Sequence, residues 1–226
     1  MRSALPKPIV PFQGKPIVAH LIDSFRQAGV HDIYLIVGHG AEEVKQTIGQ
    51  GVHYVYQKIQ KGTADAVQQV RYARRWTNED VFVFVGDSPL ITTQTIARLE
   101  AHHRDTNASC TFLTAMFPID LPYARVLKNE KGELLACVEE KNATADQLLV
   151  RELLSSHFIF KARELFGYLD EIKADKDNQE FYLTDIIGIF LKHDLKVETV
   201  LIENYKELVG LNTPEDIQWA EKALHS

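Results

Sequence analysis

The sequence is poor in cysteine and has no long apolar run. Among its 226 residues only Cys110 and Cys137 are cysteines, and both lie in apolar stretches without CxxC spacing. We therefore expect two buried free thiols and a reducing, cytoplasmic location. No apolar run reaches the length of a membrane span, and the two cationic residues near the N-terminus are not followed by the apolar segment of a signal peptide. We expect no membrane partner.

The sequence also lacks an excess of positive charge. The formal net charge is −6 and the isoelectric point is about 5.8, which argues against nucleic acid as a partner. The nine histidines are scattered, and the adjacent His102 and His103 would point to different sides of a helix, so we expect no zinc site. A Ser-His-Asp elbow and a G-x-x-x-x-G-K-[ST] phosphate loop are absent as well.

The first hundred residues alternate between helical and strand patterns. Helices are indicated by apolar residues at helical spacing, and strands by short β-branched runs. The expected helices cover 15–30, 41–49, 62–75 and 93–104, and the expected strands cover 32–37, 52–56 and 80–85. This alternation implies a parallel sheet covered on both faces.

The pattern changes after residue 108, where several strands follow one another. A turn over "NEKG" (129–132) predicts a hairpin, and Thr213 followed by Pro214 predicts the start of a closing helix. We expect one α/β domain over 1–226 with an antiparallel or mixed second half. The expected strands cover 109–117, 124–129, 132–140 and 196–202, the expected helices cover 182–194 and 213–224, and a strand followed by a helix covers 155–172.

The strongest local signal for a site is "VFVFVGDSPLI" (81–91). Ligands of open α/β sheets bind beyond the carboxyl ends of the strands, and Asp87 lies just past such an end, after Gly86. A carboxylate there suits a Mg²⁺ ion that bridges phosphates. Read alone, the segment is more simply a turn whose aspartate caps the following residues.

Three weaker signals accompany it. "QKIQKGTADAV" (57–67) places a polar loop before a helix, where backbone N–H groups bind anions or polar base edges, although a Gly-Thr start is usually a cap. Asn212 in "GLNTPED" offers a ligand for a hard metal or, more simply, an Asx-turn. "VEEKNAT" (138–144) holds Glu139 at a strand end and reads alone as a solvated charge run.

Taken in order, these motifs carry a resemblance that none of them carries alone. "SALPKPIVPFQGKPIVAHLID", "GTADAV", "VGDSPLI", "YARV", "VEEKNAT", "EFYLTDII" and "GLNTPED" resemble the sugar-1-phosphate nucleotidyltransferase family, and within it most resemble the uridylyltransferase (pyrophosphorylase) domain of bifunctional N-acetylglucosamine-1-phosphate enzymes. The resemblance implies a Rossmann-like, glycosyltransferase-A-like fold with a mixed, mostly parallel sheet and helices on both faces. It also implies Mg²⁺-dependent joining of a nucleoside triphosphate, foremost UTP, to a sugar 1-phosphate, with release of pyrophosphate.

The resemblance assigns roles to individual residues. Lys7 would neutralise phosphate charge as the catalytic cation, and Asp87 with Asn212 would hold Mg²⁺. The implied nucleotide-binding residues are Gln57, which would read the uracil edge, Gly62, Thr63, Gly86 and Asp87. The implied sugar-binding residues are Tyr123, Ala124, Glu139 and Leu154, with Arg125 flanking the sugar loop.

The chain departs from the family pattern at several of these positions. Ala124 replaces a glycine where the backbone approaches the sugar. Leu154 replaces an asparagine that would bind the amino sugar, so the identity of the sugar stays open and need not be N-acetylglucosamine. Val85 replaces a tyrosine. Asp65 replaces a histidine, and "GTADAV" is closer to the motif of adenylyl- and other sugar nucleotidyltransferases. The identity of the nucleotide base therefore stays open as well.

The largest departure concerns the first residues. The family pattern opens with an apolar strand and a G-x-G-T-R loop ahead of L-P-K, and "MRSALPK" matches only the end of that loop, with Met1 on the motif's own methionine. We therefore expect a chain started at an internal methionine, inactive or nearly so, whose unpaired sheet edges favour aggregation, a partner or a homo-oligomer. Two alternatives are a non-catalytic relative that binds a nucleotide or sugar nucleotide, and a transferase for a non-sugar phosphate.

Overall fold

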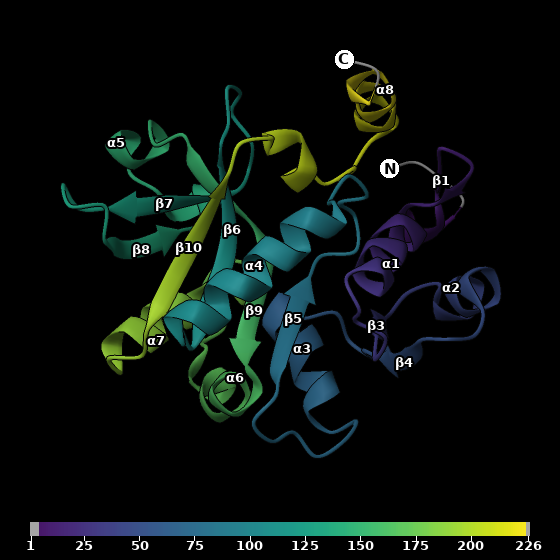
Figure 1. Ribbon diagram of the computed structural model, residues 1–226, viewed down its shortest axis with the longest axis horizontal. Helices are drawn as coiled ribbons and strands as arrows, with labels where there is room; N and C mark the ends of the chain where they lie inside the picture. The colour runs from purple at the N-terminus through teal and green to yellow at the C-terminus, as the bar shows by residue number, and fades with distance from the viewer. Residues whose placement is uncertain (1–4, 225–226) are drawn as a thin grey trace. The chain divides into compact units, whose positions relative to one another are not determined.

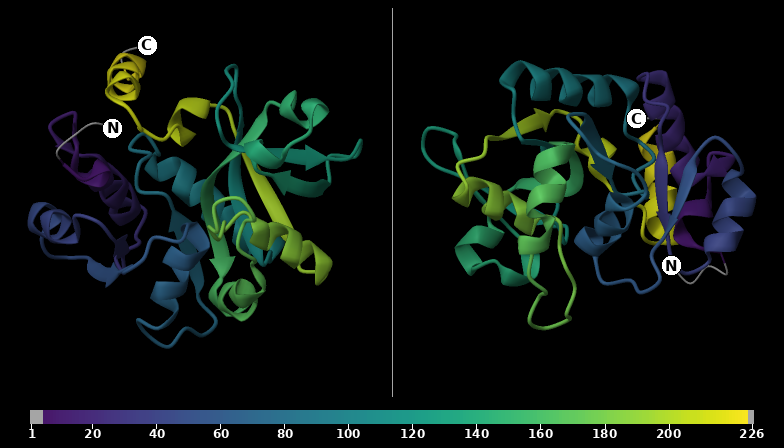
Figure 2. Two further views of the ribbon diagram at one scale, coloured as in Figure 1. Left: turned by 180° about the vertical axis from the view of Figure 1, so that it is seen from behind. Right: turned by 90° about the horizontal axis from the view of Figure 1, so that it is seen from below.

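The computed structural model describes residues 5–224, so the expectations about Met1 and its neighbours lie outside the described residues (Figures 1 and 2). The described chain divides into two compact units. Unit 1 comprises residues 5–60, 85–97 and 206–224, and unit 2 comprises 61–84 and 98–205. Each unit is described by itself, and the single domain over 1–226 stays a prediction.

Unit 2 is built on a sheet of six described strands in the order β10-β6-β9-β7-β8, with β5 paired to β9. Since β10 is parallel to β6, and β9 is antiparallel to β6, β5 and β7, four strands share one direction while β9 and β8 run the other way. The expected mixed α/β sheet is thus confirmed. The strands are β5 (Asp80–Phe84), β6 (Cys110–Met116), β7 (Ala124–Lys128), β8 (Leu134–Val138), β9 (Glu152–Lys161) and β10 (Val197–Ile202).

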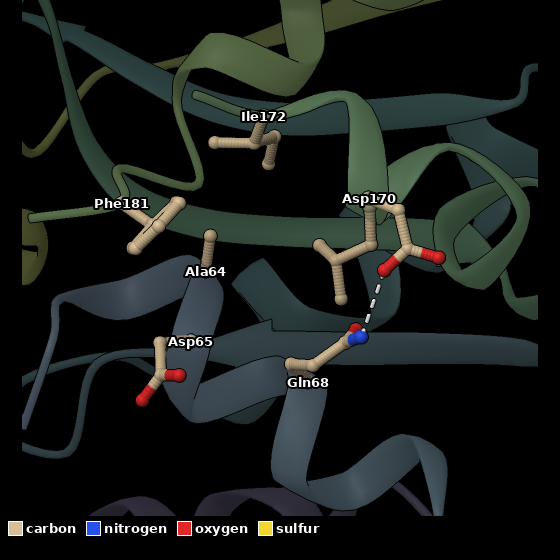
Figure 3. A pocket seen from close by; sticks show the side chains of 7 residues that line it. Ala64, Asp65, Gln68, Asp170, Ile172 and Phe181 are labelled. Carbon is tan, nitrogen blue, oxygen red and sulfur yellow. Dashed lines mark hydrogen bonds between the residues drawn. The ribbon is translucent and has the colours of Figure 1, made fainter. Parts of the chain in front are cut away.

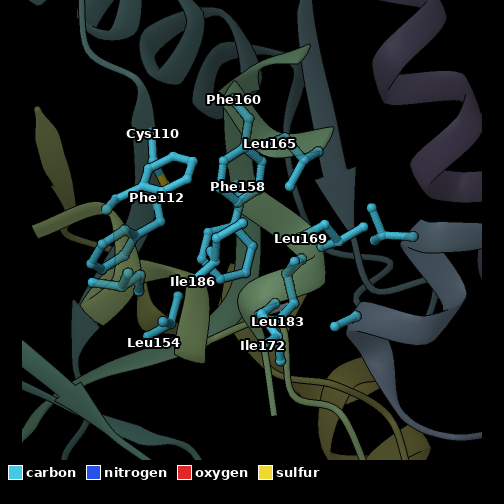
Figure 4. Packing of buried hydrophobic residues seen from close by; sticks show 14 of the residues in the cluster. Cys110, Phe112, Leu154, Phe158, Phe160, Leu165, Leu169, Ile172, Leu183 and Ile186 are labelled. Carbon is cyan, nitrogen blue, oxygen red and sulfur yellow. The ribbon is translucent and has the colours of Figure 1, made fainter. Parts of the chain in front are cut away.

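Helices cover both faces of this sheet. Successive side chains of a strand point to opposite faces. On one face, the buried Thr111 hydroxyl lies 2.8 Å from Nδ1 of His103 in α4, while Cys110 and Phe112 face a cluster made with α6 and α7 (Figure 4). The helices of the unit are α3 (Thr63–Arg71), η2 (Glu140–Asn142), α5 (Ala145–Leu148), α6 (Ala162–Tyr168), η3 (Leu169–Glu171) and α7 (Asp185–Lys192), and α4 (Thr93–Thr106) enters it from unit 1.

Aromatic rings form the centre of this cluster. Phe158 and Phe160 stack with ring centroids 5.2 Å apart, and the Phe190 ring of α7 meets Phe160 edge-on. Burying each such side chain stabilises the fold by about 1.5–3 kcal/mol. The expected burial of the cysteines holds fully for Cys110 and partly for Cys137; both are free thiols, and burial raises the pKa of each.

Short elements of unit 1 pack around apolar clusters smaller than that of unit 2. One cluster includes Phe12, Ile17 and Leu211, and another includes Val37 and Val44. β3 and β4 pair in parallel through α2, as the alternation of the sequence predicts. The elements are η1 (Lys7–Ile9), β1 (Pro11–Phe12), β2 (Lys15–Pro16), α1 (Ile17–Gln27), β3 (Tyr34–Val37), α2 (Ala41–Ile48), β4 (His53–Tyr56) and α8 (Pro214–Ala223), with η4 (Tyr205–Leu208) at the boundary between the units.

Two expected helices begin later than the sequence pattern indicates. The helix expected from residue 15 begins at Ile17, because Lys15 and Pro16 pair with β1 across a turn in which Gln13 and Gly14 both have positive φ. The helix expected from residue 182 begins at Asp185, because the main chain before it is bonded to the turn that precedes α3.

Two features that short sequence motifs predict are confirmed, namely the start of α8 and the turn at "NEKG". Thr213 caps α8 in a reciprocal capping box with Asp216, and Pro214 is its first residue. The "NEKG" turn closes with a 2.9 Å bond from Gly132 N–H to the Asn129 carbonyl. Within residues 5–224 no helix combines the length and the apolar character needed to cross a membrane.

Candidate functional site

Three side chains predicted to act together meet in unit 1. The Lys7 ammonium at the start of η1 donates to Oδ2 of Asp87 and to Oδ1 of Asn212. The three residues lie far apart in the chain, and each is positioned by its own loop. A carboxylate oxygen and an amide oxygen therefore converge on one cation, the arrangement that a hard metal ion also requires.

The segment around Asn212 is held against Asp87 by the main chain. Leu211 N–H donates to the Asp87 carbonyl at 2.9 Å, and a Cβ atom at Gly210 would lie only 2.9 Å from Oδ1 of Asp87. Asn212 is oriented in turn, since its N–H donates to the Asp216 carboxylate at 2.7 Å and its amide group donates to the Gly210 carbonyl at 3.1 Å. Gly210 and Asp216 are thus positioning residues that the sequence reading missed, although both lie in the quoted "GLNTPED".

The remaining predicted residues of unit 1 lie at strand ends. Gln57 follows β4, is buried, and its N–H donates to the Val37 carbonyl at 2.8 Å. Gly86 follows β5, and a Cβ atom there would make only ordinary contact with Val18. The loop after Asp87 is anchored by the buried Glu207, which accepts hydrogen bonds from Thr92 and Thr95.

Unit 2 carries the rest of the predicted nucleotide-binding residues. Gly62 has φ 96° and a Cβ atom there would lie 2.5 Å from the Phe181 carbonyl oxygen, so only glycine fits. Thr63 opens α3, and its hydroxyl accepts a hydrogen bond from the N–H of Leu183 at 2.9 Å. The sequence reading quoted "EFYLTDII" only for the resemblance and did not foresee this contact.

The predicted sugar-binding residues of unit 2 fall into two environments. Ala124 on β7 and Leu154 on β9 are directly opposite each other and both are buried in the apolar cluster, so the two departures from the family pattern are neighbours. Tyr123, next to Ala124, packs its ring edge-on against Phe117. Arg125 is buried and donates to the Leu121 and Tyr123 carbonyls.

Glu139 lies in a polar environment instead. Burial raises the pKa of its carboxyl group, a hydrogen bond from Thr184 opposes that rise, and the nearby Asp185 adds to it. Burial also raises the pKa of Asp185. The nearby cation Lys141 is directed to Asp175, 2.8 Å away, and lies 4.6 Å from the centre of the Tyr182 ring.

A pocket of about 220 Å³ lies beside α3 in unit 2 (Figure 3). Gln68 bridges its wall by donating to Asp170 at 2.9 Å, while the other amide atom of Gln68 is buried without a partner among the described residues. None of the predicted site residues lines it. The lining residues are Ala64, Asp65, Gln68, Leu169, Asp170, Ile172 and Phe181.

Comparison with known proteins identifies the family of the chain. Residues 1–182 match the model of the MobA-like NTP transferase domain. The chain belongs to the MobA-like NTP transferase family. It is 38% identical over 224 residues to the bifunctional protein GlmU of Staphylococcus epidermidis, an alignment that covers 99% of this chain and 50% of that protein. The chain therefore spans about half the length of the curated relatives it matches.

Solved structures of the family's fold superpose well on the chain. A Bacillus anthracis protein described as a glucose-1-phosphate thymidylyltransferase gives a TM-score of 0.76 at 18% identity and covers 97% of this chain and 86% of its own. A UDP-glucose pyrophosphorylase complexed with UDP-glucose gives the same TM-score at 16% identity, over 97% of this chain and 90% of its own. At these identities the likeness shows the fold, and the expected Rossmann-like nucleotidyltransferase fold is confirmed.

Proposed function

We propose that this NTP transferase domain joins a nucleoside triphosphate, foremost UTP, to a sugar 1-phosphate. A phosphate oxygen of the sugar 1-phosphate would attack the α-phosphorus, and the bond to the β-phosphate would break, so that pyrophosphate leaves with the bonding electrons. The observation that carries the proposal is the convergence of Lys7, Asp87 and Asn212. The domain match and the similarity to GlmU support it.

Lys7 supplies the positive charge of the chain itself. Phosphoryl-type transfer depends mainly on positioning and on stabilising negative charge, and an ammonium group can do both at the triphosphate. Asp87 and Asn212 would hold Mg²⁺, which when bound neutralises and orients the phosphate oxygens. The Lys7 ammonium would then leave the side-chain oxygens of Asp87 and Asn212 and bind the phosphates instead.

The small number of protein ligands fits a magnesium ion shared with a substrate. Among residues 5–224 no group of three or more His, Cys, Asp or Glu side chains could hold a metal ion. Mg²⁺ is commonly held by one or two carboxylates together with waters and substrate phosphates, so Asp87 and Asn212 suffice for such a site.

The substrate-side residues keep the roles that the family resemblance implies. Gln57 would read the edge of the base, and Gly62 with Thr63 would contact its face. Glu139 would accept hydrogen bonds from sugar hydroxyls. Because Ala124 and Leu154 make an apolar pair where the family has a glycine and an asparagine, the acceptors to compare are glucose 1-phosphate and N-acetylglucosamine 1-phosphate.

The test is release of pyrophosphate from pairs of nucleoside triphosphates and sugar 1-phosphates. It is run with residues 1–226 and with a form that includes any residues encoded in frame before Met1. Mg²⁺-dependent release by either form supports the proposal. Nucleotide binding without release by both forms would instead favour a non-catalytic binding protein.

The site assignment has a matched control within unit 1. Lys7→Ala and Asp87→Ala should each lower turnover by two orders of magnitude or more, about the effect of losing a major charge-stabilising group. Lys15→Ala and Asp23→Ala disrupt an exposed ion pair of 2.7 Å in the same unit and should leave turnover unchanged. Equal effects of the two pairs would reject the assignment.

A further inference from the structure

Glu207 is a buried carboxylate to which the proposed reaction gives no part. The residue is 8% exposed, and its Oε2 accepts hydrogen bonds from the N–H and the hydroxyl of Thr92 at 3.1 Å each and from the Thr95 hydroxyl at 2.6 Å. Hydrogen bonds to an ionised acceptor are about twice as strong as those between neutral groups. Glu207 therefore joins two segments of unit 1 that are 115 positions apart in the chain.

Thr92 and Thr95 lie at the N-terminus of α4, which begins a short loop after Asp87. Thr95 N–H donates to the Thr92 hydroxyl at 3.2 Å, as to an N-cap residue, and Glu207 accepts from the same turn. A negative charge is stabilised there, because the first N–H groups of a helix have no partner within the helix. The three hydrogen bonds, called the Glu207 anchor below, thus fix the far end of the loop that begins at Asp87.

A second anchor joins the same two segments at their other ends. Leu211 N–H donates to the Asp87 carbonyl at 2.9 Å, and Gly210 leaves room for the Asp87 carboxylate. Leu208 and Leu211 are also fully buried. A segment held at one point can pivot about it, whereas a segment held at both ends has a fixed orientation. Asn212 directly follows the segment held in this way, so the direction in which its side chain extends depends on both anchors.

We propose that Glu207 is a positioning residue of the candidate site, which acts through Asn212 and sets its place relative to Asp87. Without the Glu207 anchor, the segment 207–212 would pivot about Leu211, and the two oxygens that now meet at the Lys7 ammonium would converge less closely. This inference rests on the proposed function, which gives Asp87 and Asn212 their part in the reaction.

A double-mutant cycle tests how Glu207 acts. Glu207→Met keeps the length of the side chain and removes the acceptor, so kcat should fall about tenfold or more, since a misplacement of about 1 Å can cost about a hundredfold. In an Asn212→Ala background the same change should lower kcat less than about twofold, because the group that Glu207 positions is gone. An equal fall in both backgrounds would overturn the inference, since a general effect on the fold would act in both.

Ser24 provides the matched control. Its hydroxyl donates to the Ile91 carbonyl at 2.8 Å, so it holds the loop before α4 from α1. Ser24→Ala removes this bond and should leave kcat within about twofold of the wild type. Glu207→Gln retains an acceptor oxygen without the charge, so its effects should be in the same direction as those of Glu207→Met and smaller. It serves the comparison if Glu207→Met does not fold.

Amide hydrogen exchange tests the anchor without requiring turnover. Exchange at Leu211 N–H should be about tenfold faster in Glu207→Met than in the wild type and Ser24→Ala, because the segment opens more often. Exchange at Gln57 N–H, which is bonded to the Val37 carbonyl in the same unit, should stay unchanged. Wild-type exchange at Leu211, or equal acceleration at both amides, would overturn the inference. Absence of pyrophosphate release by the wild type would count against the proposed function alone, and exchange at Leu211 would then decide on the anchor.

Discussion

The Asp87 carboxylate lies so close to Gly210 that a side chain at position 210 would collide with it. A Cβ atom at position 210 would be 2.9 Å from Oδ1 and 3.0 Å from Oδ2 of Asp87. The carbonyl of Asp87 meanwhile holds Leu211 through its N–H. The glycine at position 210 thus leaves room for the Asp87 carboxylate, and its role does not depend on a positive φ.

Gly210→Ala should separate Asp87 from Asn212. The Asp87 side chain is 22% exposed and can rotate away, so the free energy of unfolding should change by less than about 1 kcal/mol, an effect typical of sites outside the core. Turnover should fall at least tenfold, because the oxygens no longer converge. Kinetics and urea denaturation check this. Gly188→Ala is the control, since a Cβ atom there meets nothing within 4 Å; an active Gly210→Ala would contradict the prediction.

Gly62→Ala should destabilise the fold. The new Cβ atom would meet the Phe181 main chain at 2.5 Å, and alanine disfavours φ 96°. A cost of about 1–3 kcal/mol is expected for forcing such a conformation. The midpoint of urea denaturation measures it. Gly167→Ala in α6, where a Cβ atom meets nothing within 4 Å, should not lower the midpoint, and equal midpoints for both variants would refute the account.

Ser156→Gly should stabilise the protein. Ser156 has φ 64° at an irregularity between β6 and β9, a conformation that costs a residue other than glycine about 1–2 kcal/mol. Part of the gain is offset by the greater freedom of glycine in the unfolded chain, leaving about 0.5–1 kcal/mol. Ser155→Gly should do the opposite, because the buried Ser155 hydroxyl lies 2.9 Å from Nδ1 of His157. Thermal unfolding of the two variants gives the comparison.

His157 should make the fold sensitive to mild acid. Burial lowers the pKa of its imidazole to about 3, whereas the pKa of a histidine in the unfolded chain is about 6.5. Below a pH of about 6.5 the unfolded state binds a proton that the folded state does not. The free energy of unfolding therefore decreases as the pH is lowered, by up to about 1.4 kcal/mol per pH unit, until the pKa of the folded state is reached.

The measurement is urea denaturation at pH 7, 6 and 5. His157→Gln should be less stable at pH 7, because its packing against Phe84 is lost, but should lose less stability between pH 7 and pH 5 than the wild type. His31→Gln replaces an exposed histidine and should follow the wild type. Parallel pH profiles for the wild type and His157→Gln would exclude this role of His157.

Features with a local cause could be read from the sequence. Thr213 and Pro214 predict the start of α8 because capping involves residues three positions apart, and "NEKG" predicts its turn for the same reason. The sheet class follows from the order of strand and helix patterns. The site residues, by contrast, came from a resemblance of ordered motifs, and their binding roles stay predictions.

Contacts between distant residues were decided only by the tertiary structure. The composition and periodicity of the sequence determined the α/β class, the buried cysteines and most elements, because these depend on near neighbours. The meeting of Lys7 with Asn212, 205 positions apart, depends on loop placement instead. The hydroxyl of Thr63 illustrates the difference: it lies at the start of α3, where the sequence indicates a helix cap, and in the fold it accepts a hydrogen bond from the N–H of Leu183, 120 positions away.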